Sequence, residues 1–168
     1  MEILMKNFIK KYNIKYFYHF TDINNLESIR KYGLFSLSEI QIRGIYVAIF
    51  GGNEWSHNAD SRFGVDKYVH LAFDTNHPML YFAQKENRIN NPIWLKINTN
   101  IIFKDGVKFT NDVANKFGIT PYNINEIENY LDCKALLINP IWKSEEYQNA
   151  RRSELLIPNH IPSAYISW

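Results

Sequence analysis

The sequence is poor in cysteine, which limits the kinds of site that it can build. Cys133 is the only thiol in the chain. A single cysteine allows no intrachain disulfide and no cysteine-based zinc site. We therefore expect Cys133 to be a packed thiol and the protein to work in a reducing compartment.

Long hydrophobic runs are absent too, and no segment approaches the length needed to cross a bilayer. The N-terminal stretch MEILMKNFIKK interrupts its apolar side chains with charge and offers no small-residue cleavage site. We therefore predict no signal peptide. Together these features predict a cytoplasmic protein that does not act at a membrane.

The chain also lacks a large excess of either charge, because its 19 Lys and Arg are nearly balanced by 17 Asp and Glu. A net charge of +2 does not by itself indicate nucleic-acid binding, although clustered basic side chains could still form a groove. The sequence has no paired-histidine metal motif and no second carboxylate at an evident glycosidase spacing, so we expect no metal site.

The chain does contain enough apolar material for a core, since its 168 residues are 46% hydrophobic and 15% aromatic. Without repeats or linkers, residues 1–168 are expected to form one domain. Strands are predicted at residues 16–21, 45–50, 68–73, 93–97, 101–104, 135–138 and 154–157, and helices at residues 4–13, 23–32, 36–43, 78–82, 111–117 and 124–131. This irregular mixture predicts an α+β fold.

Residues 51–64 are too polar, and their apolar residues too few, to predict either a helix or a strand. A loop of this length inside a compact domain is usually functional or mobile. We therefore treat this segment as a candidate recognition loop.

Glu154 opens a short aliphatic run that Pro158 ends, which is the pattern of a buried strand. An ionised carboxylate in apolar surroundings is costly, so it is usually exposed, paired or used in chemistry. By itself the residue could be a solvated glutamate at a strand end. It becomes a candidate catalytic group because of the motifs that precede it.

Three segments, in order, resemble the DarT family of DNA ADP-ribosyltransferase toxins. Residues 18–34 (YHFTDINNLESIRKYGL) are similar to the His-x-Thr strand, Asn-Leu helix and Gly-Leu stop that open this family. Residues 68–73 (YVHLAF) and 77–81 (HPMLY) resemble its aromatic strand and Ser-Pro-Met-Leu-Tyr motif, and residues 153–157 (SELLI) resemble its Ala-Glu-Phe-Leu-Val strand. The resemblance implies an ADP-ribosyltransferase-like fold, with mixed or antiparallel sheets around a central NAD cleft and flanking helices.

The resemblance also implies a reaction in which NAD loses nicotinamide and its ADP-ribose passes to a nucleobase in single-stranded DNA. A carboxylate aimed at the ribose would stabilise positive charge on the sugar and could remove a proton from the acceptor, which suits Glu154. An arginine should neutralise the diphosphate; Arg62 is our first candidate and Arg43 the second. Either could instead be a surface charge.

The remaining NAD contacts are assigned by resemblance. His19, Thr21 and Asn25 are expected in the NAD pocket, and Phe73 and Tyr81 could stack on a ring of the cofactor. Alternatively, His19 could be a hydrogen-bonded core histidine, Thr21 a helix cap, and the two aromatic residues ordinary parts of the core.

The acceptor strand is expected to contact the 51–64 segment and the residues before Glu154. Aromatic side chains stack on splayed bases and basic ones hold phosphates. The candidates are Trp55, His57, Phe63, Met79, Arg151 and Arg152.

Two departures from the family pattern leave the acceptor open. Asn76 and His77 stand where the family shows an Arg-Ser pair, and a histidine, His70, lies within a stretch that is more aromatic in the family. RNA or protein acceptors, a tRNA 2′-phosphotransferase, and a non-catalytic module of the same fold therefore remain alternatives. Kinship also implies a macrodomain antitoxin resembling DarG as partner, in a toxin-antitoxin or phage-defence system.

Overall fold

An antiparallel sheet of seven strands forms the centre of the molecule. A computed structural model describes residues 2–52 and 54–168 of the chain, with the side chains of residues 54–56 left out of the description. The strands lie in the order β6-β5-β7-β3-β1-β4-β9, and β2 and β8 form a separate pair. Their bounds are β1 Tyr16–Asp22, β2 Leu34–Phe35, β3 Tyr68–Ala72, β4 Pro92–Asn98, β5 Lys108–Thr110, β6 Tyr122–Asn123, β7 Glu154–Pro158, β8 His160–Ile161 and β9 Ile166–Ser167.

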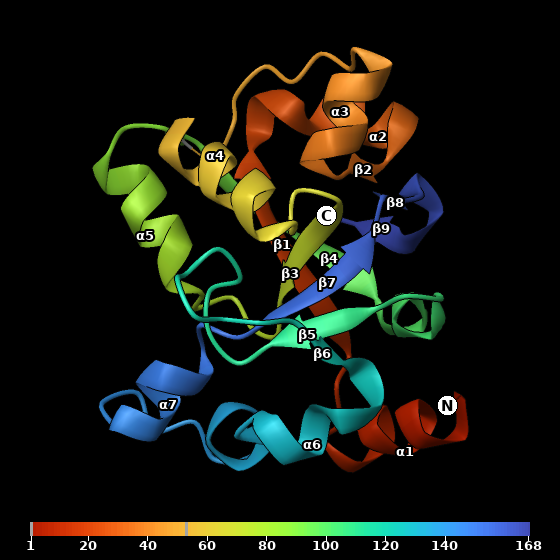
Figure 1. Ribbon diagram of the computed structural model, residues 1–168, viewed down its shortest axis with the longest axis vertical. Coiled ribbons are helices and arrows are strands. Elements are labelled where there is room, and N and C mark those ends of the chain that lie inside the picture. Colours follow the sequence, from red (N-terminus) through yellow and green to blue (C-terminus); the bar gives the residue numbers. More distant parts are fainter. Residues whose placement is uncertain (1, 53) are drawn as a thin grey trace.

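Helices gather at the two ends of this sheet (Figure 1). Helices α2, α3 and α4 lie at one end, α1, α6 and α7 at the other, and α5 along one side. The helices are α1 Glu2–Lys11, α2 Leu26–Tyr32, α3 Leu37–Arg43, α4 Glu54–Phe63, α5 Pro78–Lys85, α6 Ile127–Tyr130 and α7 Glu145–Ala150; shorter turns are η1 Ile23–Asn25, η2 Thr99–Phe103, η3 Ile124–Glu126, η4 Lys134–Ile138 and η5 Ser163–Tyr165.

The aliphatic run after Glu154 is a fully buried central strand, as its pattern predicted. Leu155, Leu156 and Ile157 of β7 have no exposed surface. Strand β7 pairs with β3 on one side and β5 on the other. Each completely buried aliphatic side chain contributes about 1.5 to 3 kcal/mol to folding, so the strand that carries Glu154 is a rigid support.

Local signals set the helix starts near the site. The Asp22 carboxylate accepts the backbone N–H of Asn24, and the Ser36 hydroxyl accepts that of Glu39. Pro78 opens α5, and the side chain of His77 caps it by accepting from the Met79 N–H. The predicted strands at 16–21, 68–73, 93–97 and 154–157 are likewise confirmed, with shifts of one or two residues at their ends.

The prediction of an irregular 51–64 segment was wrong, because residues 54–63 form α4. The side chains of His57 and Asp60 line a cavity on one side of this helix, whereas Asn58 and Arg62 line a groove on another. Its apolar residues, Trp55, Ala59 and Phe63, recur every four residues but form only a narrow stripe in a mainly polar segment, so the helical pattern is weak.

In two other segments, backbone groups form hydrogen bonds with side chains in place of the backbone partners of a regular helix or strand. Residues 45–50 form no strand, and the amide of Asn25 instead bonds the backbone of Ile49. Residues 111–117 form no helix, because the N–H groups of Val113 and Ala114 are donated to carboxylates of Asp112 and Glu154.

Three further predictions need correction. Of the residues predicted as strands, 101–103 lie in the 3₁₀ helix η2, which ends before Lys104, and 135–138 lie in the π-helical turn η4. The predicted helix at 124–131 is divided into η3 and α6. Glu128 of this segment accepts hydrogen bonds from Lys11, the last residue of α1, and from Tyr12, which follows it. Short apolar runs do not separate a strand from a buried helical turn.

Within the described residues, none of the helices is both long and apolar enough to cross a bilayer.

Candidate active site

The register of three central strands brings the N-terminal and C-terminal motifs together. Tyr18 of β1 lies opposite Ala72 of β3, and Ala72 lies opposite Glu154 of β7. His19 is the neighbour of Tyr18 in sequence. Motifs at opposite ends of the chain are thus held two strands apart by the backbone ladder.

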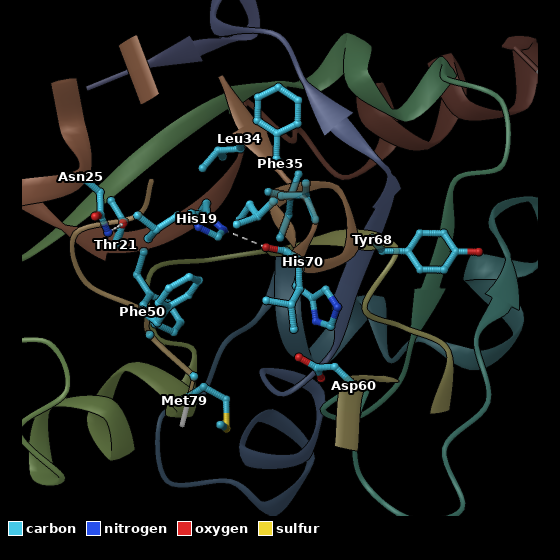
Figure 2. A pocket seen from close by; sticks show the side chains of 18 of the residues that line it. His19, Thr21, Asn25, Leu34, Phe35, Phe50, Asp60, Tyr68, His70 and Met79 are labelled. Carbon is cyan, nitrogen blue, oxygen red and sulfur yellow. Dashed lines mark hydrogen bonds between the residues drawn. The ribbon is translucent and has the colours of Figure 1, made fainter. Parts of the chain in front are cut away.

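His19 and Glu154 line the same cavity, which has a volume of about 280 Å³. The cavity lies between the sheet, the start of α2 and α4 (Figure 2). Thr21 and Asn25 line it as well, so the whole predicted His-x-Thr and Asn constellation meets Glu154 in one site.

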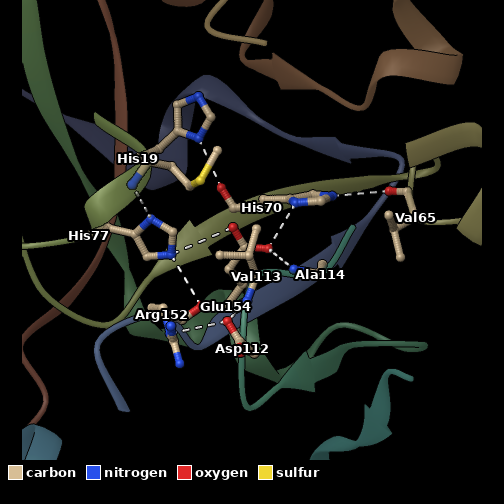
Figure 3. A network of polar contacts seen from close by, with 10 residues as sticks. His19, Val65, His70, His77, Asp112, Val113, Ala114, Arg152 and Glu154 are labelled. Carbon is tan, nitrogen blue, oxygen red and sulfur yellow. Dashed lines mark hydrogen bonds and ion pairs between the residues drawn. The ribbon is translucent and has the colours of Figure 1, made fainter. Parts of the chain in front are cut away.

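Glu154 is buried and its two carboxylate oxygens have unequal surroundings (Figure 3). Oε2 lies 3.2 Å from Nδ1 of His70 and accepts the Ala114 N–H at 2.9 Å. Oε1 lies 3.6 Å from Nε2 of His77, which is beyond hydrogen-bond distance. Burial alone would raise the pKa of Glu154, but the His70 charge and hydrogen bond, then His77 and the Ala114 N–H, lower it below its usual value.

Hydrogen-bond partners assign the tautomers of two further histidines of the cavity, His19 and His77. Nδ1 of His19 lies 2.9 Å from the carbonyl oxygen of His70, so Nδ1 carries the hydrogen and Nε2 is an acceptor. His77 accepts the Met79 N–H at Nδ1 and approaches the Arg152 carbonyl with Nε2, so its hydrogen is on Nε2. Burial lowers the pKa of both histidines, which are therefore neutral at physiological pH.

Asn25 has a structural contact with a loop over the cavity in addition to its place in the cavity wall. Its side chain accepts the Ile49 N–H at 3.1 Å and donates to the Ile49 carbonyl at 2.7 Å. The same amide donates to Oγ1 of Thr21 at 3.0 Å. Asn25 thereby fixes the backbone near Ile49 beside β1, the strand that carries His19 and Thr21.

Several residues expected to contact NAD do not line this cavity. Arg43 is exposed on α3, where it pairs with Glu39 and lies over the ring of Phe35. Phe73 is buried in the core against Phe17, with their ring centres 5.7 Å apart. Arg43 lies on a helix and Phe73 just beyond the end of β3, so their order along the chain does not determine whether they reach the cavity.

A second depression, which we call the basic groove, adjoins the cavity and shares Met79, Val113 and Asn115 with it. It contains the expected residues Arg62, Phe63, Tyr81, Arg151 and Arg152, together with the unexpected Phe82, Lys116 and Phe117.

The exposure of the groove aromatics is unusual for such large apolar rings. Tyr81 is 63% exposed, Phe82 46% and Phe117 89%. Exposed rings beside basic side chains form the type of surface that binds single-stranded nucleic acid. Of the other acceptor candidates, His57 lines the cavity, and the side chain of Trp55 lies outside the described residues.

Sequence reasoning missed several residues of the cavity wall, among them His70, His77, Asp60 and Arg88. The two histidines were visible as departures from the family pattern, at places where the family has other residue types. Asp60 and Arg88 had no signal, because both lie in polar segments whose fold could not be read.

Arg88 is the arginine that lines the cavity among the residues the structure describes. Its side chain is 16% exposed and pairs with Glu86 at 2.9 Å. Arg62, by contrast, lines the basic groove. In the described part of the chain, no group of three or more His, Cys, Asp and Glu side chains is arranged to hold a metal ion.

Residues 18–168 match one protein family, described as "ssDNA thymidine ADP-ribosyltransferase, DarT". No curated protein matches the chain by sequence. Among solved structures, Thermus sp. 2.9 DarT in complex with ADP-ribosylated ssDNA has a TM-score of 0.72 and 18% identity, over 92% of this chain and 79% of that one. The same Thermus protein in complex with NAD⁺ has a TM-score of 0.63 and 18% identity, over 92% of this chain and 80% of that one.

Thermosipho africanus DarTG in complex with ADP-ribose has a TM-score of 0.70 and 18% identity, over 91% of this chain. The present chain spans 43% of the length of that protein. These likenesses confirm the α+β, ADP-ribosyltransferase-like fold expected from the sequence.

Proposed function

The chain belongs to the DarT family of single-stranded-DNA thymidine ADP-ribosyltransferases, and on this premise we propose that it transfers ADP-ribose from NAD to a thymine base. One observation carries the proposal: the buried Glu154 shares a single cavity with His19, Thr21 and Asn25. The Thermus sp. 2.9 DarT structures with NAD⁺ and with ADP-ribosylated ssDNA support it.

Glu154 is the proposed catalytic carboxylate. Breaking the bond between nicotinamide and ribose develops positive charge on the sugar, which a fixed carboxylate stabilises. Oε1 lacks a hydrogen-bond donor within normal distance among the described residues, so this oxygen is the one that suits a ribose hydroxyl or the proton of the acceptor base.

His19 and Thr21 are the proposed sugar and nicotinamide contacts. Because Nδ1 of His19 donates to the His70 carbonyl, its Nε2 can accept a hydrogen bond from a hydroxyl of the ligand. Thr21 accepts from Asn25 at Oγ1 and keeps its hydroxyl hydrogen for donation. NAD enters as co-substrate, and its chemistry needs no metal.

The diphosphate of NAD is proposed to meet Arg88, because this guanidinium belongs to the cavity wall. Arg62, the candidate from sequence, is proposed to act beside the cavity on the acceptor, since it belongs to the basic groove. The groove opens next to Met79, which borders both sites, so a base held in the groove has a short path to the reacting sugar.

The basic groove is the proposed binding site for single-stranded DNA. Arg151 and Arg152 lie on one side of it, and Tyr81 and Phe82 of α5 offer exposed rings. Single strands are held by stacking on aromatic rings and by basic contacts to phosphates, which matches this composition.

A toxin role with a macrodomain antitoxin resembling DarG is proposed by kinship, since Thermosipho africanus DarTG is among the similar structures. We propose the cytoplasm as its compartment, because both NAD and DNA are available there.

The deciding experiment incubates the protein with labelled NAD and, separately, single-stranded DNA, duplex DNA, RNA and protein. We expect label on thymine in single-stranded DNA. Glu154→Gln should reduce transfer by roughly a hundredfold or more, because the amide keeps the size of the side chain but not its charge. Label on RNA or protein alone would overturn the DNA assignment. An undiminished Glu154→Gln variant would remove Glu154 from catalysis.

A further inference from the structure

His70 contacts Glu154 directly, and the proposed reaction gives it no task. Nδ1 of its ring lies 3.2 Å from Oε2 of Glu154, and Nε2 lies 3.1 Å from the carbonyl oxygen of Val65 (Figure 3). A carbonyl oxygen only accepts hydrogen bonds, and so does an ionised carboxylate. A neutral imidazole carries one N–H and could satisfy only one of these partners. Both contacts are satisfied when His70 carries hydrogen on both nitrogens.

Asp60 supplies a second carboxylate beside the same ring. It faces His70 from α4 across the floor of the cavity (Figure 2). Its Oδ1 is buried without a hydrogen-bond partner among the described residues. A buried, incompletely bonded carboxylate is tolerated when a positive charge lies nearby. Burial, and less strongly the Glu154 charge, raise the pKa of Asp60, whereas the His70 charge and a hydrogen bond from Asn115 lower it. In their ionised forms, Asp60 and Glu154 would repel each other in this cavity unless a cation separated them.

We propose that His70 is a positioning residue for Glu154: as an imidazolium between Glu154 and Asp60, it holds the carboxylate ionised and turns Oε1 toward the substrate. This inference rests on the proposed catalytic role of Glu154. His70 acts through that carboxylate and makes no contact of its own with the reacting atoms.

The arrangement fixes which oxygen of Glu154 is used. Oε2 is occupied by His70 and by the Ala114 N–H. Oε1 faces the neutral His77 at 3.6 Å. With Oε2 bound at two points, the carboxylate cannot rotate freely, and Oε1 remains available to a ribose hydroxyl. A fixed carboxylate needs little reorganisation as charge develops on the sugar.

The titratable groups that face His70 come from three elements and from the residue that precedes α5. They are Glu154 of β7, Asp60 of α4, His19 of β1 and His77 before α5. The two other histidines are neutral, so the carboxylates decide the charge of His70. Burial alone would lower the pKa of His70, but Glu154 and then Asp60 raise it to about 9.

The first test reads the protonation of His70 directly. Histidine side-chain ¹⁵N–¹H NMR is recorded against pH on the wild-type protein, Glu154→Gln and Asp60→Asn. At pH 7.5 we expect hydrogen on both ring nitrogens of wild-type His70, and a lower pKa in each variant because each loses one negative charge. A singly protonated His70 at pH 7.5, or a pKa unchanged in both variants, would overturn the proposal.

The second test compares His70→Asn with His70→Ala over the pH range 6 to 10. The Asn amide can donate to Glu154 from the position of Nδ1 but cannot titrate. We expect wild-type kcat to fall with an apparent pKa near 9, His70→Asn to keep about a tenth of the activity without that alkaline decline, and His70→Ala to lose more.

A merely structural role would leave the alkaline decline in His70→Asn, which would contradict the inference. Circular dichroism identifies any variant that fails to fold, and for such a variant the NMR result decides. The two proposals fail separately. Absence of transfer to DNA counts against the proposed function, whereas a neutral His70 in an enzyme that depends on Glu154 counts against this inference alone.

Discussion

At the scale of single residues, the cavity shows that one residue type can take different charges within a few ångströms. His19, His70 and His77 all surround Glu154, yet burial keeps two of them neutral while two carboxylates charge the third. The partners of each ring nitrogen explain the difference. A carbonyl and a carboxylate both demand hydrogen from His70, whereas an N–H of the backbone donates to His77.

The raised pKa of His70 makes stability depend on pH. A histidine whose folded pKa lies near 9, above its usual 6.5, stabilises the protein fully below pH 6.5, and this stabilisation is lost as the pH rises through 9. The shift corresponds to roughly 3 kcal/mol at most. We expect the wild-type Tm to fall between pH 6.5 and 9 and that of His70→Asn to change much less. Parallel curves would contradict the assigned charge.

Two arginines can be compared to test which one binds NAD and which one binds the DNA acceptor. Removal of a charged hydrogen bond costs about 1.5 to 3 kcal/mol, or roughly ten- to a hundredfold in binding. Arg88→Ala should therefore raise KM for NAD with little change in KM for DNA, and Arg62→Ala should do the reverse. Steady-state kinetics with each substrate varied decides this. An effect of Arg62→Ala on NAD alone would restore the assignment made from sequence.

At the scale of elements, the junction between α2 and β2 depends on a glycine. Gly33 ends α2 with φ 82° and ψ −164°, and an added Cβ would lie 2.2 Å from the backbone oxygen of Ile161 in β8. This backbone conformation is essentially restricted to glycine. The junction between α2 and β2 can approach β8 so closely only because the side chain is absent.

Gly33→Ala should destabilise the protein by on the order of 3 kcal/mol, because strain and a clash with fixed backbone add together. Gly44 is the matched control: it also has a positive φ, of 62°, but no atom within 4 Å would meet its Cβ. Gly44→Ala should cost about 1 kcal/mol. Urea unfolding of both variants measures the difference, and equal losses would show that the close approach to β8 is unimportant.

At the scale of the whole molecule, the position of charges matters more than their sum. The net charge is only +2, yet Arg62, Lys116, Arg151 and Arg152 all line one groove, where Asp112 pairs with Lys116 and Arg152. Binding of single-stranded DNA should therefore depend on salt. Removing one basic side chain that binds a phosphate should reduce the slope of log K against log salt concentration by about 0.7.

Arg62→Gln tests this expectation, with Lys10→Gln on α1 as the control outside the groove. Fluorescence anisotropy with a labelled thymine-containing strand, measured from low to moderate salt, gives the slopes. We expect a smaller slope for Arg62→Gln and an unchanged slope for Lys10→Gln. Equal changes would mean that the protein binds DNA through its overall charge and that the groove has no special part.

Much of the site could be predicted from order along the chain. The strand with His19 and Thr21, the helix that Gly33 ends, and the buried strand after Glu154 were predictable, because each rests on local propensity or a short apolar run. The helix α4 was not, since its apolar stripe is narrow and the rest of the segment is polar.

The sequence alone determined which chemical groups are available and in which elements they lie: a carboxylate at the mouth of a core strand and a His-x-Thr strand before a helix. Only the tertiary structure decided which of them meet. The β1-β3-β7 register brought His70 to Glu154, and the packing of the other segments left Arg43 and Phe73 outside the cavity and brought Arg88 into it. The physical reason is that hydrophobic patterns fix local structure, whereas the charge of a buried group depends on neighbours that are distant in sequence.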